Sequence, residues 1–500
     1  MSLDRAALQS EYERARREVD AAALQRIGVS FRELGDSDAA EAAFRHALEI
    51  DPGSVYVRNN LAVILQDRGA TAEACRLFQR NVEDRPGDPA LLANYFMSAQ
   101  YVPGVTAADL YQIHGLWRNQ IQSVVPVCPA MDSRDPGRRL RIGFLSAELV
   151  THPVGHFLLP LIRALDRSQC RVIAFAANRQ RDAMTKNFQA AFDEWIDVTN
   201  LTDADAARVI RDRRIDILIE TAGQTVGNRL GVIVQRPAPI QMSWAGYVGT
   251  TGVPEIDFVL ADSIHVPASE DRFHTERIIR MPRIYVPYLP PSYAPPPSPL
   301  PAASYGAVTF GSFNHPAKLT DQVVNAWVGI LGALPDTRLN LRYRGVDSVA
   351  NRSRWAQAMT AAGLDPARIA FAGLSSHAGM LAAYCDIDIA LDPFPYSGGV
   401  TTLEALWMGV PVVTLTGKTF AGRHSTAYLS HVGLSRLATT DIDDYQSAAI
   451  VLATALRELT SLRSDLRARM SRSPMLDHAG FAGELLSALR SVWSDYCRQN

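Results

Sequence analysis

Cysteine is scarce in this sequence, and the few cysteines that occur form no recognisable frame. The chain has five of them, with no CxxC pair, at Cys75, Cys128, Cys170, Cys385 and Cys497. Such spacing argues against a disulfide-bonded secreted domain and against a structural zinc site. We therefore expect a protein of a reducing compartment.

Long hydrophobic runs and a large net charge are lacking as well. No apolar stretch reaches the roughly 18–20 residues that span a bilayer, and residues 1–20 lack the apolar core of a signal peptide. The formal net charge is -2, so no bulk attraction to nucleic acid or to an anionic membrane is expected. These features predict a cytoplasmic protein with no nucleic-acid partner and no membrane span.

Two common nucleotide-binding motifs are missing. The sequence has neither a GxxxxGK(S/T) P-loop nor a GxGxxG fingerprint. Among residues 305–500, Asp-x-Asp strings occur only as Asp386-Ile-Asp388, at a predicted strand, and as Asp441-Ile-Asp443. If the chain binds a diphosphate, we expect side chains and a helix terminus, rather than a metal ion, to balance its charge.

What the sequence does contain begins with a repeat. A 34-residue window from Ala21 to Ser54 matches a tetratricopeptide repeat, the next window matches again, and a third begins at Pro89 and decays after Tyr95. The matching positions are Leu24, Ile27, Gly28, Phe31, Ala40, Phe44, Ala47 and Pro52, then Leu61, Ala62, Leu65, Ala74, Phe78 and Pro86. Residues 1–100 are thus predicted to form a helical repeat region. It either binds an extended peptide or serves as a helical cap or dimerisation element.

After a helical connector and linker, residues 101–137, with a helix expected over Ala107–Gln122, strands alternate with helices. This pattern predicts parallel α/β sheets. A proline-dense stretch, residues 285–304, separates two Rossmann-like domains, residues 138–284 and 305–500, the second including the C-terminal helices. The predicted strands are Leu140–Ser146, Arg171–Ala176, Trp195–Val198, Ile215–Ile219, Ile240–Trp244 and Phe258–Ala261, then Val308–Phe313, Arg338–Arg344, Arg368–Ala372, Ile387–Leu391 and Val410–Leu415.

The stretch between the last two strands is the strongest candidate for an anion site. Gly398 and Gly399 lead into a helix that begins near Thr401 and Thr402 and runs to about Met408. Glycines allow close approach of a ligand, and a helix N-terminus offers free N–H groups and partial positive charge. Glu404, one turn in, could accept hydrogen bonds from sugar hydroxyls. An ordinary βα turn is the alternative.

Ligands of parallel sheets bind beyond the carboxyl ends of the strands, which directs attention to the residues that follow each strand. His152 lies before a predicted helix start at Pro153 and could act as a general base or bind an anion. A metal pair with His156 is disfavoured, because a helix that begins at Pro153 would not hold both rings on one face. Two polar, glycine-containing loops belong on the same wall or are simple turns; they include Gln224, Thr225, Tyr247 and Thr250.

Basic residues of the second half could face the same anion. Lys318 follows the strand at Val308–Phe313, and Arg423 and His424 follow the strand at Val410–Leu415. Positive groups that converge with the helix start near Gly398 are what a diphosphate leaving group needs. A solvated surface lysine is the alternative for Lys318.

These motifs, in this order, resemble the O-GlcNAc transferase/SPINDLY family of protein glycosyltransferases. The resemblance runs from about Ala21 to Leu434 and rests on the repeats and on RIGFLSAELVTHPVGH, RPAPIQMSWAGYVGTTG, TFGSFNHPAKLT and DPFPYSGGVTTLEALWMGVPVVTLTG. It implies an α/β GT-B fold, two Rossmann-like domains facing a nucleotide-sugar cleft. It also implies transfer of GlcNAc from UDP-GlcNAc (GDP-fucose in the SPINDLY branch) to Ser or Thr of a protein, with inversion and without a metal or other cofactor.

The resemblance assigns roles residue by residue. Lys318 matches the lysine that contacts the donor diphosphate, and His152 matches an active-site histidine near donor and acceptor. Donor-binding positions are Asn314, His377, Gly398, Gly399, Val400, Thr401, Thr402, Glu404 and Arg423, and acceptor-side positions are His156, Gln224, Thr225, Tyr247 and Thr250. Gln224 stands where many bacterial relatives have histidine, and His377 where the animal enzymes have a lysine near the uracil.

Three hypotheses follow. The first is an inverting, metal-independent protein O-glycosyltransferase whose partners are a nucleotide sugar and a protein or peptide acceptor. The second is the same fold with another donor, GDP-fucose or a nonulosonic-acid nucleotide, acting on a bacterial surface protein such as flagellin. The third is a repeat scaffold with a degenerate transferase half, against which the presence of both His152 and Lys318 argues. The repeat region could also mediate homo-oligomerisation.

Overall fold

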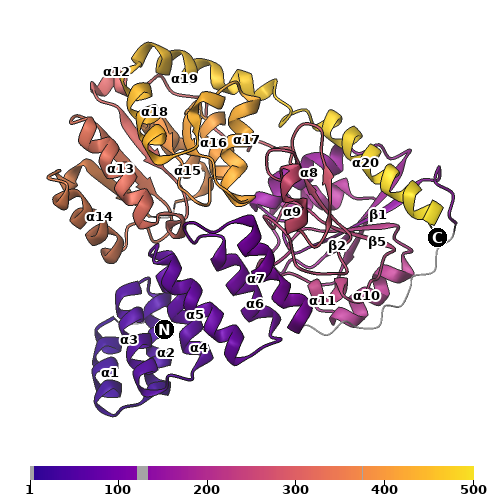
Figure 1. Ribbon diagram of the computed structural model, residues 1–500, viewed down its shortest axis with the longest axis horizontal. Helices are drawn as coiled ribbons and strands as arrows, with labels where there is room; N and C mark the ends of the chain where they lie inside the picture. Colours follow the sequence, from indigo (N-terminus) through magenta and orange to yellow (C-terminus); the bar gives the residue numbers. More distant parts are fainter. Residues whose placement is uncertain (1–4, 121–132, 374, 500) are drawn as a thin grey trace.

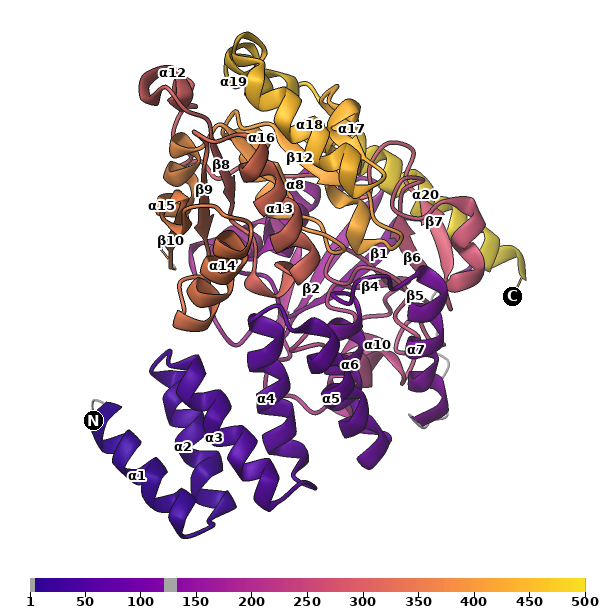
Figure 2. The ribbon, with the colours of Figure 1, turned by 60° about the vertical axis from the view of Figure 1, so that its left-hand side comes forward.

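The computed structural model describes residues 5–120, 133–373 and 375–499 of the chain. A helical region precedes two α/β units, and it lies against both of them (Figures 1 and 2). Its helices are α1 (Arg5–Arg17), α2 (Ala21–Glu33), α3 (Ser37–Ile50), α4 (Val55–Asp67), α5 (Thr71–Asp84), α6 (Pro89–Ala99) and α7 (Ala107–Gln120). No helix among the described residues is long and apolar enough to cross a membrane.

The two predicted repeats are confirmed as the helix pairs α2–α3 and α4–α5. Gly28 shows why close approach is needed, because a Cβ at this position would lie 2.6 Å from the ring of Phe44. The third repeat begins at Pro89 as predicted, with Asp88 capping α6 through the N–H groups of Ala90 and Leu91. Residues 121–132 of the predicted connector and linker lie outside the described residues.

The first α/β unit contains a seven-stranded parallel sheet in the order β3-β2-β1-β4-β5-β6-β7. Its strands are β1 (Leu140–Ser146), β2 (Cys170–Ala176), β3 (Glu194–Asp197), β4 (Ile217–Glu220), β5 (Ile240–Ser243), β6 (Phe258–Ala261) and β7 (Arg277–Arg280). The connections contain α8 (Pro153–Ala164), α9 (Ala183–Ala191), α10 (Asp203–Asp212), α11 (Leu230–Ile233) and the 3-10 turn η1 (Ala268–Phe273). Every strand predicted for this half is confirmed, and the edge strand β7 was missed.

The second unit contains a six-stranded parallel sheet in the order β10-β9-β8-β11-β12-β13. Its strands are β8 (Thr309–Ser312), β9 (Arg338–Arg342), β10 (Ile369–Ala372), β11 (Ile389–Leu391), β12 (Val412–Leu415) and β13 (Ala438–Thr439). Its helices are α12 (Pro301–Tyr305), α13 (Asp321–Ala333), α14 (Val349–Ala361), α15 (His377–Ala383), α16 (Val400–Trp407), α17 (His424–His431), α18 (Ile442–Thr454) and α19 (Leu456–Ser471), with short turns η2 (Pro316–Lys318), η3 (Pro366–Arg368), η4 (Tyr384–Asp386), η5 (Ala421–Arg423) and η6 (Ser435–Leu437). The predicted strands are confirmed, and the short β13 was missed.

The last helix, α20 (His478–Gln499), leaves the second unit and lies across the first (Figure 1). It packs on α8, Phe481 stacks on Trp244 with 6.1 Å between ring centroids, and Arg138 lies over Trp493. The helix was predicted to belong to the second domain, whereas these contacts place it against the first unit. The exact domain boundaries stay predictions.

The two sheets together form the expected GT-B arrangement, and their strand orders locate the site. In each sheet the chain winds outward from a central pair, β1 and β4 in the first and β8 and β11 in the second. Ligands of such sheets bind at the carboxyl ends of the strands beside this switch point. The loops that follow these four strands therefore face one another.

Candidate active site

A cavity of about 590 Å³ lies between the two α/β units. Loops from both sheets line it, and Tyr101, from the turn between α6 and α7, contributes a third wall. Eight of the predicted site residues line this cavity: His152, Thr225, Asn314, Lys318, Gly399, Val400, Thr401 and His424. They come from five different loops, so the fold brings them together as predicted.

Lys318 is held at the cavity wall by three contacts. Its Nζ donates to the carbonyl oxygen of Ser397 at 2.7 Å, lies 3.5 Å from Oδ1 of Asn314, and sits 4.3 Å from the ring centroid of Tyr396. Burial lowers the pKa of Lys318 to about 8, an effect that the carboxylate of Asp392 partly opposes. Burial destabilises the charged form of this amine, and a bound anion would stabilise that form.

The N-terminus of α16 opens into the same cavity. Gly399 is its N-cap residue, and no side chain of the described structure caps it. The N–H of Gly398 donates to Asp392 at 2.6 Å, and Thr401 Oγ1 donates to Asn314 Oδ1 at 3.0 Å. Asn314 thus joins the helix start to Lys318, and the two positive elements share one wall of the cavity.

Gly398 and Thr402 serve the turn itself. A Cβ on Gly398 would collide with Thr402 and Asp392, whereas a Cβ on Gly399 would meet nothing within 4 Å. Thr402 is buried and its Oγ1 lies 2.7 Å from Ser425 Oγ. These packed residues hold the helix start while Gly399 stays open to a ligand.

His377 and Glu404 form a pair beside the cavity. Nε2 of His377 lies 2.6 Å from Oε1 of Glu404, and its Nδ1 lies 2.7 Å from the hydroxyl of Tyr293. The hydrogen bond to Glu404 raises the pKa of His377. Glu404 is buried, and its predicted function as an acceptor for sugar hydroxyls would compete with His377.

His152 caps α8 as predicted. Its Nδ1 accepts a hydrogen bond from the N–H of Val154 at 3.3 Å, and burial lowers its pKa to about 4. A neutral ring whose Nδ1 accepts carries its proton on Nε2. In this arrangement His152 is a hydrogen-bond donor to the cavity, which favours anion or hydroxyl binding over general-base chemistry.

Glu148 lines the cavity and was not among the predicted site residues. Its Oε2 accepts a hydrogen bond from Thr221 Oγ1 at 3.0 Å, and burial, with a smaller contribution from Glu220, raises its pKa to about 8. A buried carboxyl that titrates near neutral pH suits proton transfer. Its position just after the first strand was the one available sequence signal.

Several predicted acceptor-side residues lie outside the cavity. The ring of His156 is bound to the carbonyl of Leu289 at 3.0 Å, and the amide of Gln224 donates to the carbonyl of Thr251 at 2.8 Å. The hydroxyl of Tyr247 is bonded to His114 of α7. These three side chains brace loops rather than line the cavity.

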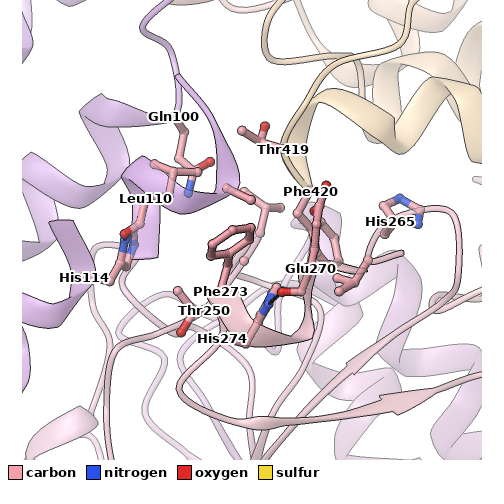
Figure 3. Close-up of a pocket in the computed structure, with 14 residues that line it drawn as sticks. Gln100, Leu110, His114, Thr250, His265, Glu270, Phe273, His274, Thr419 and Phe420 are labelled. Atoms are coloured by element: carbon pink, nitrogen blue, oxygen red, sulfur yellow. Dashed lines mark hydrogen bonds between the residues drawn. The ribbon is translucent and has the colours of Figure 1, made fainter. Parts of the chain in front are cut away.

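Thr250 lines a separate pocket of about 20 Å³ where the helical region meets both α/β units (Figure 3). Its hydroxyl donates to Glu276 at 2.7 Å. Arg423 is also taken up elsewhere, because its guanidinium is bidentate to Glu270, at 2.6 Å and 2.8 Å. This pair, whose arginine is buried and whose glutamate is partly exposed, joins the second unit to η1 of the first, so Arg423 is not free to bind a ligand.

Comparison with known proteins agrees with this geometry. A sequence profile of glycosyl transferase family 41 matches residues 119–287 and 300–485, and a tetratricopeptide-repeat profile matches residues 31–94. The chain is 37% identical over 413 residues to a probable UDP-N-acetylglucosamine–peptide N-acetylglucosaminyltransferase SPINDLY of Petunia hybrida. The aligned residues make up 81% of this chain and 44% of that protein. It is 26% identical to the probable transferase of the same kind named SEC from Arabidopsis thaliana, and this alignment covers 72% of this chain and 38% of that protein. The chain thus spans less than half the length of these curated relatives.

A solved structure is similar over nearly the whole chain. It is a mutant of the O-GlcNAc transferase of Thermobaculum terrenum, 33% identical, with a TM-score of 0.89 and coverage of 99% of this chain and 98% of that one. The profile match covers more than half of the sequence, and it includes the loops that line the cavity. The chain therefore belongs to glycosyl transferase family 41.

Proposed function

We propose that this protein is an inverting, metal-independent O-glycosyltransferase that moves GlcNAc from UDP-GlcNAc to Ser or Thr of a protein acceptor. The observation that carries the proposal is the convergence of Lys318 and the uncapped N-terminus of α16 on one wall of the cavity. Both elements favour negative charge, and a departing nucleoside diphosphate carries it. The names of the relatives support the donor and the peptide acceptor.

The chemistry is an in-line displacement. The acceptor hydroxyl attacks the anomeric carbon, the bond from that carbon to the diphosphate breaks, and the hydroxyl proton passes to a base. Lys318 and the α16 N–H groups stabilise the leaving diphosphate. The Nε2–H of His152 donates a hydrogen bond to the nucleotide sugar or to the acceptor protein. Glu148, with its pKa near 8, is the carboxylate of the cavity wall suited to receive the proton.

The acceptor enters from the side of the first unit, where Thr225 lines the cavity, and the helical region offers it a short peptide-binding surface. Two and a half repeats make little groove, so selection by a long superhelix is not proposed. We further propose a cytoplasmic location and assembly through the helical region.

A second candidate is the same reaction with GDP-fucose or a nonulosonic-acid nucleotide on a bacterial surface protein. It is favoured by Gln224 and His377, which depart from residues common in relatives. His377, the first residue of α15, is paired with Glu404 of α16, beside the expected nucleotide site. A scaffold with a degenerate transferase half is the non-enzymatic alternative.

A donor panel separates these candidates. Purified protein is incubated with UDP-GlcNAc, GDP-fucose and a nonulosonic-acid nucleotide, and nucleotide release is measured with and without added acceptor protein. We expect turnover of UDP-GlcNAc that Lys318→Ala reduces far more than it reduces peptide binding. Turnover of another donor alone selects the second candidate. If neither wild type nor Lys318→Ala turns over any donor, the scaffold is supported.

A further inference from the structure

The helical region touches the segment that carries Lys318. The turn between α4 and α5 contains Gly69, which is buried and has φ +79°. A Cβ at Gly69 would run into the carbonyl oxygen of Leu319, the residue after Lys318, and would lie 2.7 Å from Nη1 of Arg354. The turn is therefore seated directly on the backbone that positions the lysine.

The preceding repeat provides a natural comparison. Gly35 lies 34 residues before Gly69, with φ +77°, and its N–H donates to the carbonyl of Arg32 at 3.0 Å. The N–H of Gly69 donates to the carbonyl of Gln66 at 2.9 Å in the same way. A Cβ at Gly35 meets nothing within 4 Å. The two glycines share one backbone conformation and differ in what lies against them.

A second contact reaches the other end of the lysine side chain. Tyr101 stacks on Tyr396 with 5.0 Å between ring centroids and an interplanar angle of 24°. Tyr396 is the ring over which Lys318 Nζ lies, and it precedes Ser397, whose carbonyl accepts from that Nζ. The helical region thus contacts both the backbone beside Lys318 and the surroundings of its amine.

A third contact fixes the turn laterally. Nη1 of Arg354 donates to the carbonyl of Arg68 at 2.9 Å, and its Nη2 donates to Asp321, the first residue of α13, at 2.7 Å. The arginine therefore ties the turn of the helical region to the helix that follows Lys318. Arg68, Asp321 and Arg354 are not among the residues that line the cavity.

We propose that the helical region is a positioning element of the donor site, in which Gly69 and Tyr101 fix the place of Lys318. This inference rests on the proposed binding of the donor diphosphate by Lys318. It gives the repeats a function in the reaction itself, in addition to acceptor binding or assembly. A short displacement of a group that contacts the reacting atoms can cost about a hundredfold in rate.

The matched pair Gly69→Ala and Gly35→Ala tests the proposal. Both place alanine in a left-handed conformation at the same repeat position, so both suffer the same local strain. Only Gly69→Ala pushes on Leu319. We expect it to weaken UDP binding, measured by calorimetry, and to lower kcat/KM for the donor by about ten- to a hundredfold. Gly35→Ala should leave both values within about twofold of wild type.

Four further variants make the result decisive. If Gly69→Ala does not fold, Arg354→Met replaces it, with a smaller loss expected in the same assays. Tyr101→Leu should also weaken UDP binding, and Tyr101→Phe, which keeps the ring stack, should restore it. Lys318→Met in the same assays reports on the proposed function.

Two outcomes would overturn the proposal, and they differ. If Lys318→Met leaves UDP affinity unchanged, the assigned diphosphate contact and the positioning inference both fail. If Lys318→Met weakens binding while Gly69→Ala, or Arg354→Met in its place, matches Gly35→Ala, the donor site stands and the positioning inference alone is refuted.

Discussion

Replacing Lys318 by methionine should remove the contribution of this lysine to the pH dependence of nucleoside-diphosphate binding above pH 8. Burial lowers the pKa of Lys318 from its ordinary 10.5 to about 8, a difference that corresponds to about 3 kcal/mol. A bound diphosphate favours the ammonium form and can recover this energy. UDP should therefore bind wild type with an affinity that falls by about tenfold per pH unit above 8, to a limit of about 300-fold.

Calorimetry measures this directly. UDP is titrated into the protein between pH 7 and pH 10 in buffers of different ionisation enthalpy, which reports the protons taken up on binding. Proton uptake should be close to zero at pH 7, where the amine is already charged, and should rise toward one per site near pH 9. The ligand's own titration is common to wild type and to Lys318→Met, so it cancels in their comparison.

The side chains beside Lys318 leave this window clear, and Glu148 of the same cavity, with a pKa of about 8, titrates in both proteins and cancels in their comparison. Burial lowers the pKa of His315 to about 4, depresses that of His424 well below its ordinary value and raises that of Tyr396 to about 12. Asp392 is the facing carboxylate, and burial raises its pKa from 3.8. Wild-type affinity that stays flat from pH 7 to pH 10, or equal proton uptake by Lys318→Met, would rule out the assigned contact between Lys318 and the diphosphate.

Three further predictions follow from other parts of the structure. Glu148→Gln should lower kcat strongly. It should also raise the free energy of unfolding at pH 9 by on the order of a few kcal/mol in denaturant titrations, because the wild-type carboxyl, with its pKa raised from 4.5 to about 8, is costly to ionise in the folded protein. A variant that is less stable than wild type at pH 9 would contradict this. Arg423→Met should lower the free energy of unfolding by about 3 kcal/mol in thermal or chemical denaturation, since it leaves Glu270 unpaired. It should change UDP affinity much less than Lys318→Met does. A loss of binding free energy larger than the loss of stability would show instead that Arg423 contacts the ligand. Glu404→Gln should lower the pKa of His377 in an NMR titration, because the hydrogen bond to Glu404 is the main cause of its raised value, and an unchanged pKa would contradict the pairing.

The sequence predicts most of the fold because buried parallel strands leave strong signals. Apolar runs such as Leu140–Ser146 and Ile240–Ser243 are recognisable without neighbours. The strand Arg277–Arg280 is not, because it lies at a sheet edge, is partly exposed and begins and ends with arginine. The two-residue strand Ala438–Thr439 is too short to carry any periodic pattern.

Site residues marked by local sequence spacing were predicted, whereas those that depend on distant contacts were missed or misplaced. Lys318 and the turn at Gly399 were predictable, because local spacing after a strand places them at the sheet edge. Glu148 was missed because its raised pKa depends on burial and on Glu220 of a neighbouring strand. Arg423 was misplaced because its partner, Glu270, lies 153 residues away on the other unit. Contacts between units leave no periodic trace in a sequence.

A structure of the protein with UDP bound would show where the diphosphate lies. We expect the diphosphate in the cavity between the two units, within hydrogen-bond distance of Lys318 Nζ and of the first-turn N–H groups of α16. The base and ribose should lie toward His377 and Glu404. A diphosphate that binds elsewhere, or that sits in the cavity without contacting Lys318 or the start of α16, would refute the proposed donor site.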